Sequence, residues 1–166
     1  LKSHKIELPL YIHRDYGLPY KMDKKSLVIC ISYSGNTEET LYAYRAAIRE
    51  KLSIVAITTG GKLGKLCQKN KTPWVKTPLT NIPPRLALGC QFAALIKILV
   101  NYGLIRDSLG NISSLEKKLN PSNLEIQGKA LAKKLKNRIP FVYVSNKRGA
   151  LGPIALIWKA SFNETA

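Results

Sequence analysis

The stretch Leu27-Val28-Ile29-Cys30-Ile31-Ser32-Tyr33-Ser34-Gly35-Asn36-Thr37-Glu38-Glu39-Thr40 decides the fold. Its first five residues are a continuous apolar run, which is typical of a parallel strand that is buried on both faces. Turn and capping residues follow, and residues 38–51 then carry an apolar stripe at helical spacing. The stretch therefore predicts a strand that leads directly into a helix, the repeating unit of open α/β sheets.

Similar units follow along the chain. Further strands are expected over residues 53–58, 74–75 and 141–144, the last of them buried, and helices over residues 63–69, 86–102, 123–137 and 150–159. An alternating stretch at residues 5–14 predicts one more strand, and residues 105–121 look like a connection. Strands that alternate with helices predict an α/β fold with a parallel sheet.

Length and composition set limits on the class of protein. The chain has 166 residues, of which 45% are hydrophobic and 22% charged, and these values are usual for folded globular proteins. No run reaches the roughly 18 apolar residues that span a bilayer. The first residues have no apolar core behind them, so neither a membrane span nor a signal peptide is expected.

The formal net charge is +17, from 27 Lys and Arg against 10 Asp and Glu. Such an excess favours acidic partners in general, namely nucleic acid, anionic membranes or phosphorylated small molecules. Lysine and arginine residues on solvent-exposed helix faces, or a compositional bias of the source, would explain the same net charge. No helix-turn-helix, zinc or aromatic RNA-binding motif accompanies the charge, so it supports no nucleic-acid site by itself.

Cysteines and histidines indicate neither disulfides nor a metal site. Cys30, Cys67 and Cys90 form an odd set without CxxC spacing, which predicts buried free thiols in a reducing compartment. His4 and His13 have no ligand-like companions, and no metal site is expected.

The turn at Ser32, Ser34, Gly35 and Thr37 has the chemistry of a phosphate site. Unpaired N–H groups of the helix's first turn and its dipole attract an anion, and three hydroxyl groups can donate to anionic oxygens. Gly35 lets the backbone approach the ligand. A plain helix cap by Ser34 or Thr37 is the simpler interpretation, but it leaves Ser32 and Gly35 unused. The sequence has no Gly-Lys-Ser/Thr of a Walker loop at this turn and no G-x-G-x-x-G fingerprint.

Residues 32–40, Ser-Tyr-Ser-Gly-Asn-Thr-Glu-Glu-Thr, resemble the phosphate-binding loop of sugar isomerase (SIS) domains. More narrowly, the chain resembles the bifunctional phosphoglucose/phosphomannose isomerase family over nearly its whole length. Four further segments agree in order: Arg14-Asp15-Tyr16-Gly17-Leu18-Pro19, Ile57-Thr58-Thr59-Gly60-Gly61, Pro83-Pro84-Arg85-Leu86-Ala87-Leu88-Gly89 and Phe162-Asn163-Glu164. The resemblance implies SIS domains of flavodoxin-like, three-layer αβα architecture with a parallel sheet.

The resemblance also implies a reaction. Members of this family interconvert glucose 6-phosphate or mannose 6-phosphate with fructose 6-phosphate through a cis-enediolate, without a metal or organic cofactor. By this similarity Ser32, Ser34 and Thr37 hold the phosphate, and Gly35 and Asn36 support the loop. Arg85 stabilises the enediolate, a role that suits a permanently charged planar donor, and Glu164 is the base. The enzyme is expected in the cytoplasm, as a homodimer when intact.

Each of the two catalytic assignments has a simpler alternative. Arg85 could anchor a loop through a surface ion pair, and Glu164 could be an ordinary exposed acid. A non-catalytic SIS module that binds sugar phosphates for regulation would share the Ser/Thr loop but would not need Arg85 and Glu164 together. A basic nucleic-acid-binding protein is the alternative from another class.

The chain departs from the family pattern at both ends. The family begins with a strand and a Gly-Gly-Ser-type turn, which nothing before Leu1 matches, and it carries a catalytic histidine beyond the Asn-Glu segment. We therefore expect the middle of a longer protein. Residues 1–105 would be an N-terminally incomplete first SIS domain, 106–121 a linker and 122–166 the truncated start of a second SIS domain. Such a piece is expected to be catalytically impaired.

Overall fold

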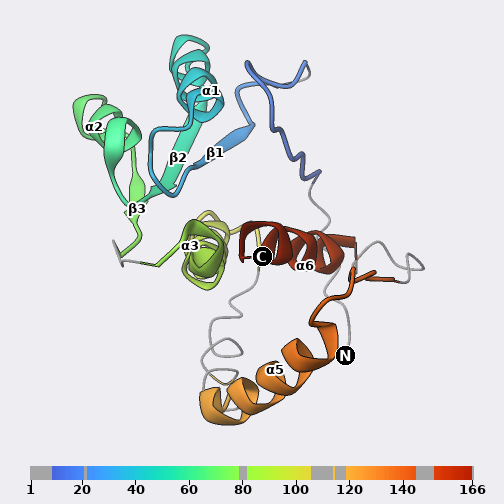
Figure 1. The fold of residues 1–166 in the computed structure, drawn as a ribbon. Coiled ribbons are helices and arrows are strands. Elements are labelled where there is room, and N and C mark those ends of the chain that lie inside the picture. Colours follow the sequence, from blue (N-terminus) through green and yellow to red (C-terminus); the bar gives the residue numbers. More distant parts are fainter. Residues whose placement is uncertain are drawn as a thin grey trace. The chain divides into compact units, whose positions relative to one another are not determined.

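The computed structural model of this chain describes residues 9–20, 22–78, 82–105, 114, 119–144 and 152–165. The chain forms two compact units, Leu1–Gly110 and Asn111–Ala166. The first unit contains the strands and the helices α1, α2 and α3, and the second contains α5 and α6 (Figure 1).

A parallel sheet of three strands is the centre of the first unit. The strands are β1 (Leu27–Ile31), β2 (Ser53–Thr58) and β3 (Trp74–Lys76), in the order β1-β2-β3. Cys30 lies opposite Ala56, and Ile57 lies opposite Val75. These strands confirm the parallel sheet that the apolar runs predict.

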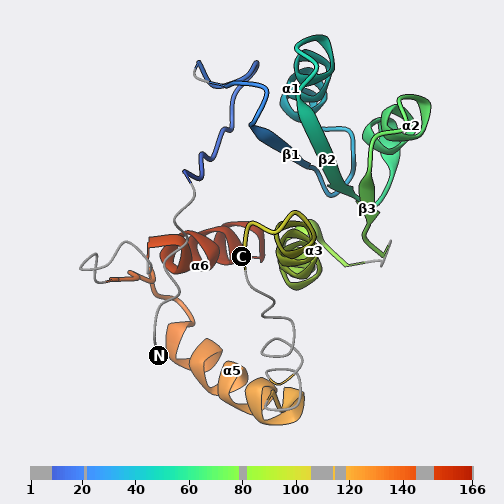
Figure 2. The ribbon, with the colours of Figure 1, turned by 180° about the vertical axis from the view of Figure 1, so that it is seen from behind.

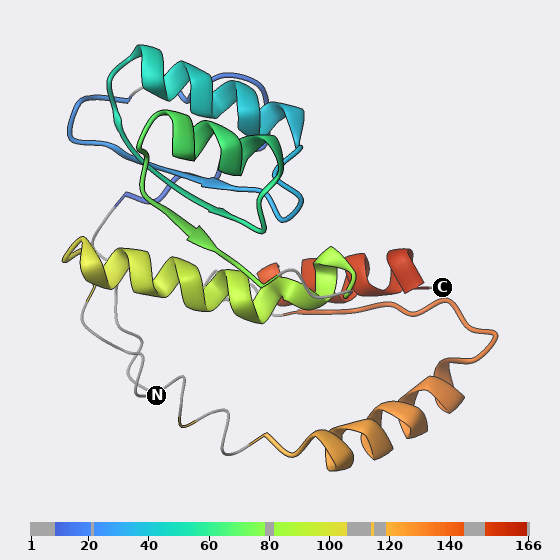
Figure 3. The same cartoon turned by 90° about the vertical axis from the view of Figure 1, so that its left-hand side faces the viewer.

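Helices cover both faces of this sheet. Helices α1 (Glu38–Arg49) and α2 (Gly61–Lys69) lie on one side, and α3 (Leu88–Asn101) lies on the other (Figure 3). The view from behind shows the same placement of the three helices about the sheet (Figure 2). A short 3-10 helix, η1 (Pro84–Ala87), leads directly into α3. The first unit is thus a three-layer α/β structure, as predicted.

Strand β2 supplies both hydrophobic cores, because its successive side chains point to opposite faces. Ile54 and Ala56 belong to the core under α1 and α2, whereas Val55 and Ile57 belong to the core under α3. The first core also contains Cys30, Leu41, Tyr44, Ala47, Leu63 and Cys67, and the second contains Ala94 and Ile98. Burial on both faces explains why β2 is a continuous apolar run.

Helix α3 and the 3-10 helix before it form a long apolar segment. By length and composition alone, Pro84–Asn101 is apolar enough to cross a membrane, although Arg85 and Lys97 interrupt it, so it is not a continuous apolar run. Ala94 and Ile98 of this segment pack against β2, and Lys97 is exposed. These contacts are those of a helix that packs on a sheet.

The second unit consists of α5 (Pro121–Leu135) and α6 (Gly152–Thr165), which confirm the two helices predicted there. Asn120 caps α5 by accepting a hydrogen bond from the N–H of Asn123 at 3.1 Å, and Pro121 occupies the first turn. None of the residues of α5 is buried.

Two predicted strands are wrong in the described part of the chain. Residues 141–144 form no strand, and Phe141 and Tyr143 are 77% and 90% exposed rather than buried. Residues 9–14 form no strand either, while the rest of the strand expected over residues 5–14 lies outside the described residues. Most of the connection expected over residues 105–121 also lies outside them.

Candidate functional site

The turn between β1 and α1 gathers the three hydroxyl groups that the sequence assigns to phosphate binding. Ser32 directly follows β1 and is 5% exposed. Its Oγ lies 2.8 Å from the Oγ1 of Thr37 and accepts a hydrogen bond from the N–H of Gly35 at 3.1 Å. The Oγ of Ser34 accepts from the N–H of Asn36 at 3.2 Å. The loop is therefore folded by its own hydroxyl groups.

These hydroxyl groups do not cap helix α1. Thr37 occupies the N-cap position, but its side chain makes no capping hydrogen bond and is paired with Ser32 instead. The simpler interpretation, in which Ser34 or Thr37 serves as a plain cap, is therefore wrong. The N–H groups of the first turn of α1 keep their capacity to bind an anion, and the helix dipole favours one there.

A second loop, which follows β2, is bonded to the first. The backbone oxygen of Tyr33 accepts hydrogen bonds from the N–H and the Oγ1 of Thr59, at 3.0 and 2.8 Å. The oxygen of Gly35 accepts from the N–H of Leu63 at 2.9 Å, within the first turn of α2. The two loops thus hold each other in place at the carboxyl ends of β1 and β2, the edge at which open α/β sheets bind ligands.

Two glycines make this close approach possible. Gly35 has φ +69°, and a Cβ atom there would overlap the backbone oxygen of Gly60. Gly61 has φ +62°, and a Cβ atom there would overlap the backbone oxygen of Ser34. Both positions combine a left-handed conformation with backbone contact, so only glycine fits. The supporting role that the sequence predicts for Gly35 has this physical basis, and Gly61 has the matching role on the other loop.

Asn36, the second predicted supporting residue, bonds the loop to the neighbouring helix. Its Oδ1 accepts a hydrogen bond from the N–H of Lys62 at 3.1 Å, at the start of α2. Gly60 at the N-cap of α2 has no side chain to do so. This junction was not predicted from the sequence. The Gly60-Gly61 pair at the start of α2 was the signal that could have indicated it.

Arg85 lies in η1, half-buried, with its Nε buried. The segment that leads to it touches the first loop, because the hydroxyl group of Tyr33 donates to the backbone oxygen of Ile82 at 3.4 Å. Glu164 belongs to α6, in the second unit. The structure thus brings Ser32, Ser34 and Thr37 together in the first unit and places the predicted base on a helix of the second.

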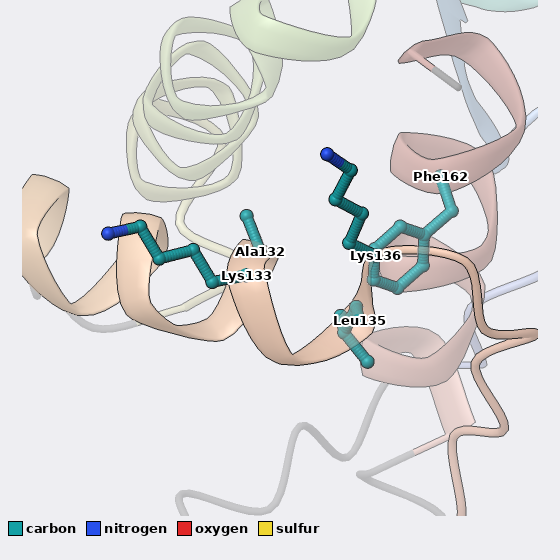
Figure 4. A pocket seen from close by; sticks show the side chains of 5 residues that line it. All are labelled: Ala132, Lys133, Leu135, Lys136 and Phe162. Carbon is teal, nitrogen blue, oxygen red and sulfur yellow. The ribbon is translucent and has the colours of Figure 1, made fainter.

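Two surface depressions contain none of the predicted site residues. One lies beside α1, and it is lined by Tyr42, Ala46 and Arg49 of this helix together with residues of the segment 17–24 that precedes β1. The other lies between the end of α5 and Phe162, and Figure 4 shows its lining side chains. There the ammonium group of Lys133 points away from the ring of Phe162 (Figure 4). No residue of the hydroxyl-bearing loop lines either depression.

The cysteines have contrasting environments. Cys30 and Cys67 are buried, as expected, but Cys90 is exposed, so the expectation of three buried thiols is wrong for Cys90. Burial raises the pKa of Cys30 to about 12, with a smaller contribution from Cys67, and burial also raises the pKa of Cys67. Among the described residues no group of three or more His, Cys, Asp or Glu could hold a metal ion.

Comparison with known proteins gives one consistent family. The chain is 37% identical over 171 residues to the bifunctional phosphoglucose/phosphomannose isomerase of Caldicellulosiruptor bescii, covering 98% of the chain and 50% of that protein. It is 32% identical over 166 residues to the protein of the same name from Aquifex aeolicus, covering 100% of the chain and 49% of that protein.

A third relative has a different name. The chain is 28% identical over 170 residues to the D-glucosamine-6-phosphate 4-epimerase of Sulfolobus acidocaldarius, covering 97% of the chain and 51% of that protein. No family model and no solved structure matches the chain. The chain spans about half the length of the curated relatives that it matches, and by these similarities it belongs to the bifunctional phosphoglucose/phosphomannose isomerase family.

Proposed function

We propose that this chain carries the phosphate-binding part of a sugar-phosphate isomerase. The whole protein would interconvert glucose 6-phosphate or mannose 6-phosphate with fructose 6-phosphate through a cis-enediolate. The observation that carries the proposal is the hydroxyl-lined loop at the uncapped start of α1, in a chain that matches proteins named for this activity. Such an isomerase must hold the phosphate, move a proton between C1 and C2, and stabilise the developing oxyanion.

The loop would supply the first of these tasks. Ser34 would donate its hydroxyl proton to the phosphoryl oxygens, and Ser32 and Thr37 would both do so once the phosphate replaces the hydrogen bond between them. The N–H groups at the start of α1 would add backbone donors. Gly35 and Asn36 support the loop through the contacts described above. Hydrogen bonds from these donors to a dianion are charge-assisted, and the backbone of the loop is already held in place by its contacts with the neighbouring loop.

Arg85 and Glu164 would supply the chemistry. Arg85 would stabilise the negative charge that develops on the enediolate, and Glu164 would carry the proton between C1 and C2. Neither step requires a cofactor in this proposal. Both assignments rest on the resemblance of the Pro-Pro-Arg and Asn-Glu segments to the family pattern.

The organisation of the protein is part of the proposal. Residues 1–105 would belong to a first SIS domain, 106–121 to a linker and 122–166 to a second SIS domain. The whole protein would be a cytoplasmic homodimer, and this chain alone would have weak activity at most. Sedimentation of the whole protein tests the dimer directly, since a monomer at assay concentrations would contradict it.

The relative named as a 4-epimerase provides a second candidate function. An epimerase that acts at C4 would also need to bind the phosphate group of a hexose phosphate, but it would need different chemistry at the sugar ring. The greater similarity to the isomerases favours isomerisation. Assays with glucose 6-phosphate, mannose 6-phosphate and D-glucosamine 6-phosphate as separate substrates distinguish the two functions.

Turnover of fructose 6-phosphate by the whole protein tests the isomerase directly. Arg85→Gln and Glu164→Gln should each lower kcat by roughly 10²-fold or more while leaving KM within a few-fold, because both act on the reacting atoms. Arg49→Gln and Glu125→Gln are the matched controls, since both residues are exposed and neither lies in a predicted site segment. Wild-type kcat in either test variant would remove that residue from the mechanism, and absence of turnover in the wild type would remove the isomerase.

A further inference from the structure

Tyr33 is the residue of the hydroxyl-bearing loop to which the proposed function gives no task. It lies between Ser32 and Ser34, so its backbone belongs to the turn that would bind the phosphate. Its side chain is half-buried, and its hydroxyl group donates to the backbone oxygen of Ile82 at 3.4 Å. Tyr33 therefore connects the turn between β1 and α1 to the segment that leads into η1.

The backbone of Tyr33 is itself fixed by the second loop. Its carbonyl oxygen accepts hydrogen bonds from the N–H and the Oγ1 of Thr59, at 3.0 and 2.8 Å, and Thr59 is buried. On the other side, the N–H of Ser32 donates to the oxygen of Ile57 in β2 at 3.1 Å. Because a tyrosine side chain has only two χ angles, little freedom remains between this fixed backbone and the hydroxyl group at Ile82.

The chain is stiff between Ile82 and Arg85. Pro83 and Pro84 join these two residues, and each proline ring locks the φ of its residue. The oxygen of Pro83 accepts a hydrogen bond from the N–H of Leu86 at 2.9 Å, which closes the 3-10 turn of η1 around Arg85. The backbone position of Arg85 is therefore coupled to the carbonyl group that the tyrosine holds.

The proposed reaction needs a fixed distance between two parts of the site. The phosphate of fructose 6-phosphate is at C6, whereas the enediolate forms at C1 and C2, so one sugar must reach both the phosphate loop and the group that stabilises the oxyanion. The Nε of Arg85 is buried, so the position of its guanidinium group depends on the position of η1. A misplacement of about 1 Å can cost on the order of 10²-fold in rate.

We propose that Tyr33 is a positioning residue of the isomerase, whose hydroxyl group holds the segment that carries Arg85 at the spacing that the substrate requires. This inference rests on the proposed function, and in particular on the role of Arg85. It gives Tyr33 no contact with the reacting atoms. Tyr33 would thus affect turnover and leave phosphate binding unchanged.

Steady-state turnover of fructose 6-phosphate by the whole protein tests this role. Tyr33→Phe removes only the hydroxyl group, and it should lower kcat roughly tenfold while KM stays within about threefold of the wild type. Calorimetric titration with fructose 6-phosphate should give the two proteins the same affinity. Tyr42→Phe is the matched control, because it removes the hydroxyl group of an exposed tyrosine on α1, and it should leave kcat and KM unchanged.

The double variant Tyr33→Phe with Arg85→Gln separates positioning from a general structural effect. If Tyr33 acts through Arg85, loss of the guanidinium group leaves nothing to position, and the double variant should stay within about twofold of the kcat of Arg85→Gln alone. Multiplied losses would overturn the positioning role. A Tyr33→Phe protein with a raised KM and the wild-type kcat would also overturn it, because the hydroxyl group would then serve binding. Far-ultraviolet circular dichroism on each variant confirms that the assayed protein is folded.

The outcomes separate this inference from the function on which it rests. If the wild type turns over fructose 6-phosphate and Arg85→Gln lowers kcat while Tyr33→Phe does not, the role of Tyr33 is wrong and the isomerase stands. If Arg85→Gln has the wild-type kcat, the role of Arg85 and this inference both fail, and the phosphate-binding role of the loop is unaffected. A wild type without turnover overturns the isomerase and this inference together.

Discussion

The hydroxyl groups of Ser32 and Thr37 are hydrogen-bonded to each other, with Oγ and Oγ1 2.8 Å apart across the turn between β1 and α1. Thr37 therefore occupies the N-cap position without capping its helix. A side-chain cap typically contributes about 1 kcal/mol of stability. The turn forgoes that contribution and retains N–H groups that an anion can use, which is the arrangement expected of a binding loop.

Replacement of Thr37 by valine removes the hydroxyl group and keeps the shape. Thr37→Val should weaken fructose 6-phosphate binding roughly tenfold. The free energy of unfolding should change by less than about 1 kcal/mol, because no helix cap is lost. Calorimetric titration and urea unfolding measure the two effects.

Thr72→Val is the control for Thr37→Val. The Thr72 hydroxyl group pairs with that of Tyr44 inside the core, so its loss should lower stability and leave binding unchanged. Binding of fructose 6-phosphate by Thr37→Val at the wild-type affinity would show that the Ser32–Thr37 pair is only structural.

Alanine at Gly35 should destabilise the first unit strongly. The φ of +69° costs a residue with a Cβ about 1–2 kcal/mol, and the added atom would also overlap the backbone oxygen of Gly60. We expect Gly35→Ala to lower the free energy of unfolding by about 2 kcal/mol or more, measured by urea denaturation. Gly89→Ala in α3, where a Cβ atom meets nothing within 4 Å, should be neutral or stabilise by up to about 1 kcal/mol. Equal stability of the two variants would contradict the contact between the loops.

Tyr44 anchors α1 to the end of α2. Its side chain is fully buried, and its hydroxyl group lies 2.7 Å from the Oγ1 of Thr72 and 3.3 Å from the Nδ2 of Asn70. Tyr44→Phe leaves the buried hydroxyl group of Thr72 without this partner and should lower the free energy of unfolding by about 1–3 kcal/mol, measured by thermal unfolding. Tyr42→Phe, at an exposed position, should change stability by less than about 0.5 kcal/mol. A Tyr44→Phe protein as stable as the wild type would show that the network contributes nothing.

The three thiols should react at different rates. In the native chain at pH 8, a thiol reagent should modify Cys90 rapidly and reach Cys30 and Cys67 only on unfolding. Burial raises the pKa of the Cys30 thiol from 9.0 to about 12, so this thiol binds its proton more tightly in the folded chain. This contribution to stability should therefore be lost as the pH rises from about 9 to 12. Rapid modification of all three thiols without unfolding would contradict the buried positions.

The local part of this fold could be predicted from the sequence. The apolar runs at residues 27–31 and 53–58 and the helical stripe after Glu38 indicate their elements because burial on both faces and helical periodicity leave direct patterns. The wrong prediction of a strand at residues 141–144 also comes from reading a local pattern. An apolar run of four residues looks identical whether or not a neighbouring strand exists to pair with it.

The contacts that complete the candidate site could not be predicted, because they join residues distant in sequence. The bond of Asn36 to Lys62 spans 26 positions, and so does the bond of Tyr33 to Thr59. A pattern of turn residues indicated that Ser32, Ser34 and Thr37 share a loop. It could not indicate that Thr37 pairs with Ser32 instead of capping α1, since both geometries use the same residue types.

The location of bound fructose 6-phosphate tests the central claim most directly. In an amide NMR titration of the full chain, the account predicts the largest shift changes at Ser32–Thr37 and at the start of α2, with smaller changes at Glu125 and Lys129 in the second unit. Saturable binding that leaves the amides of Ser32, Ser34 and Thr37 unshifted would contradict it.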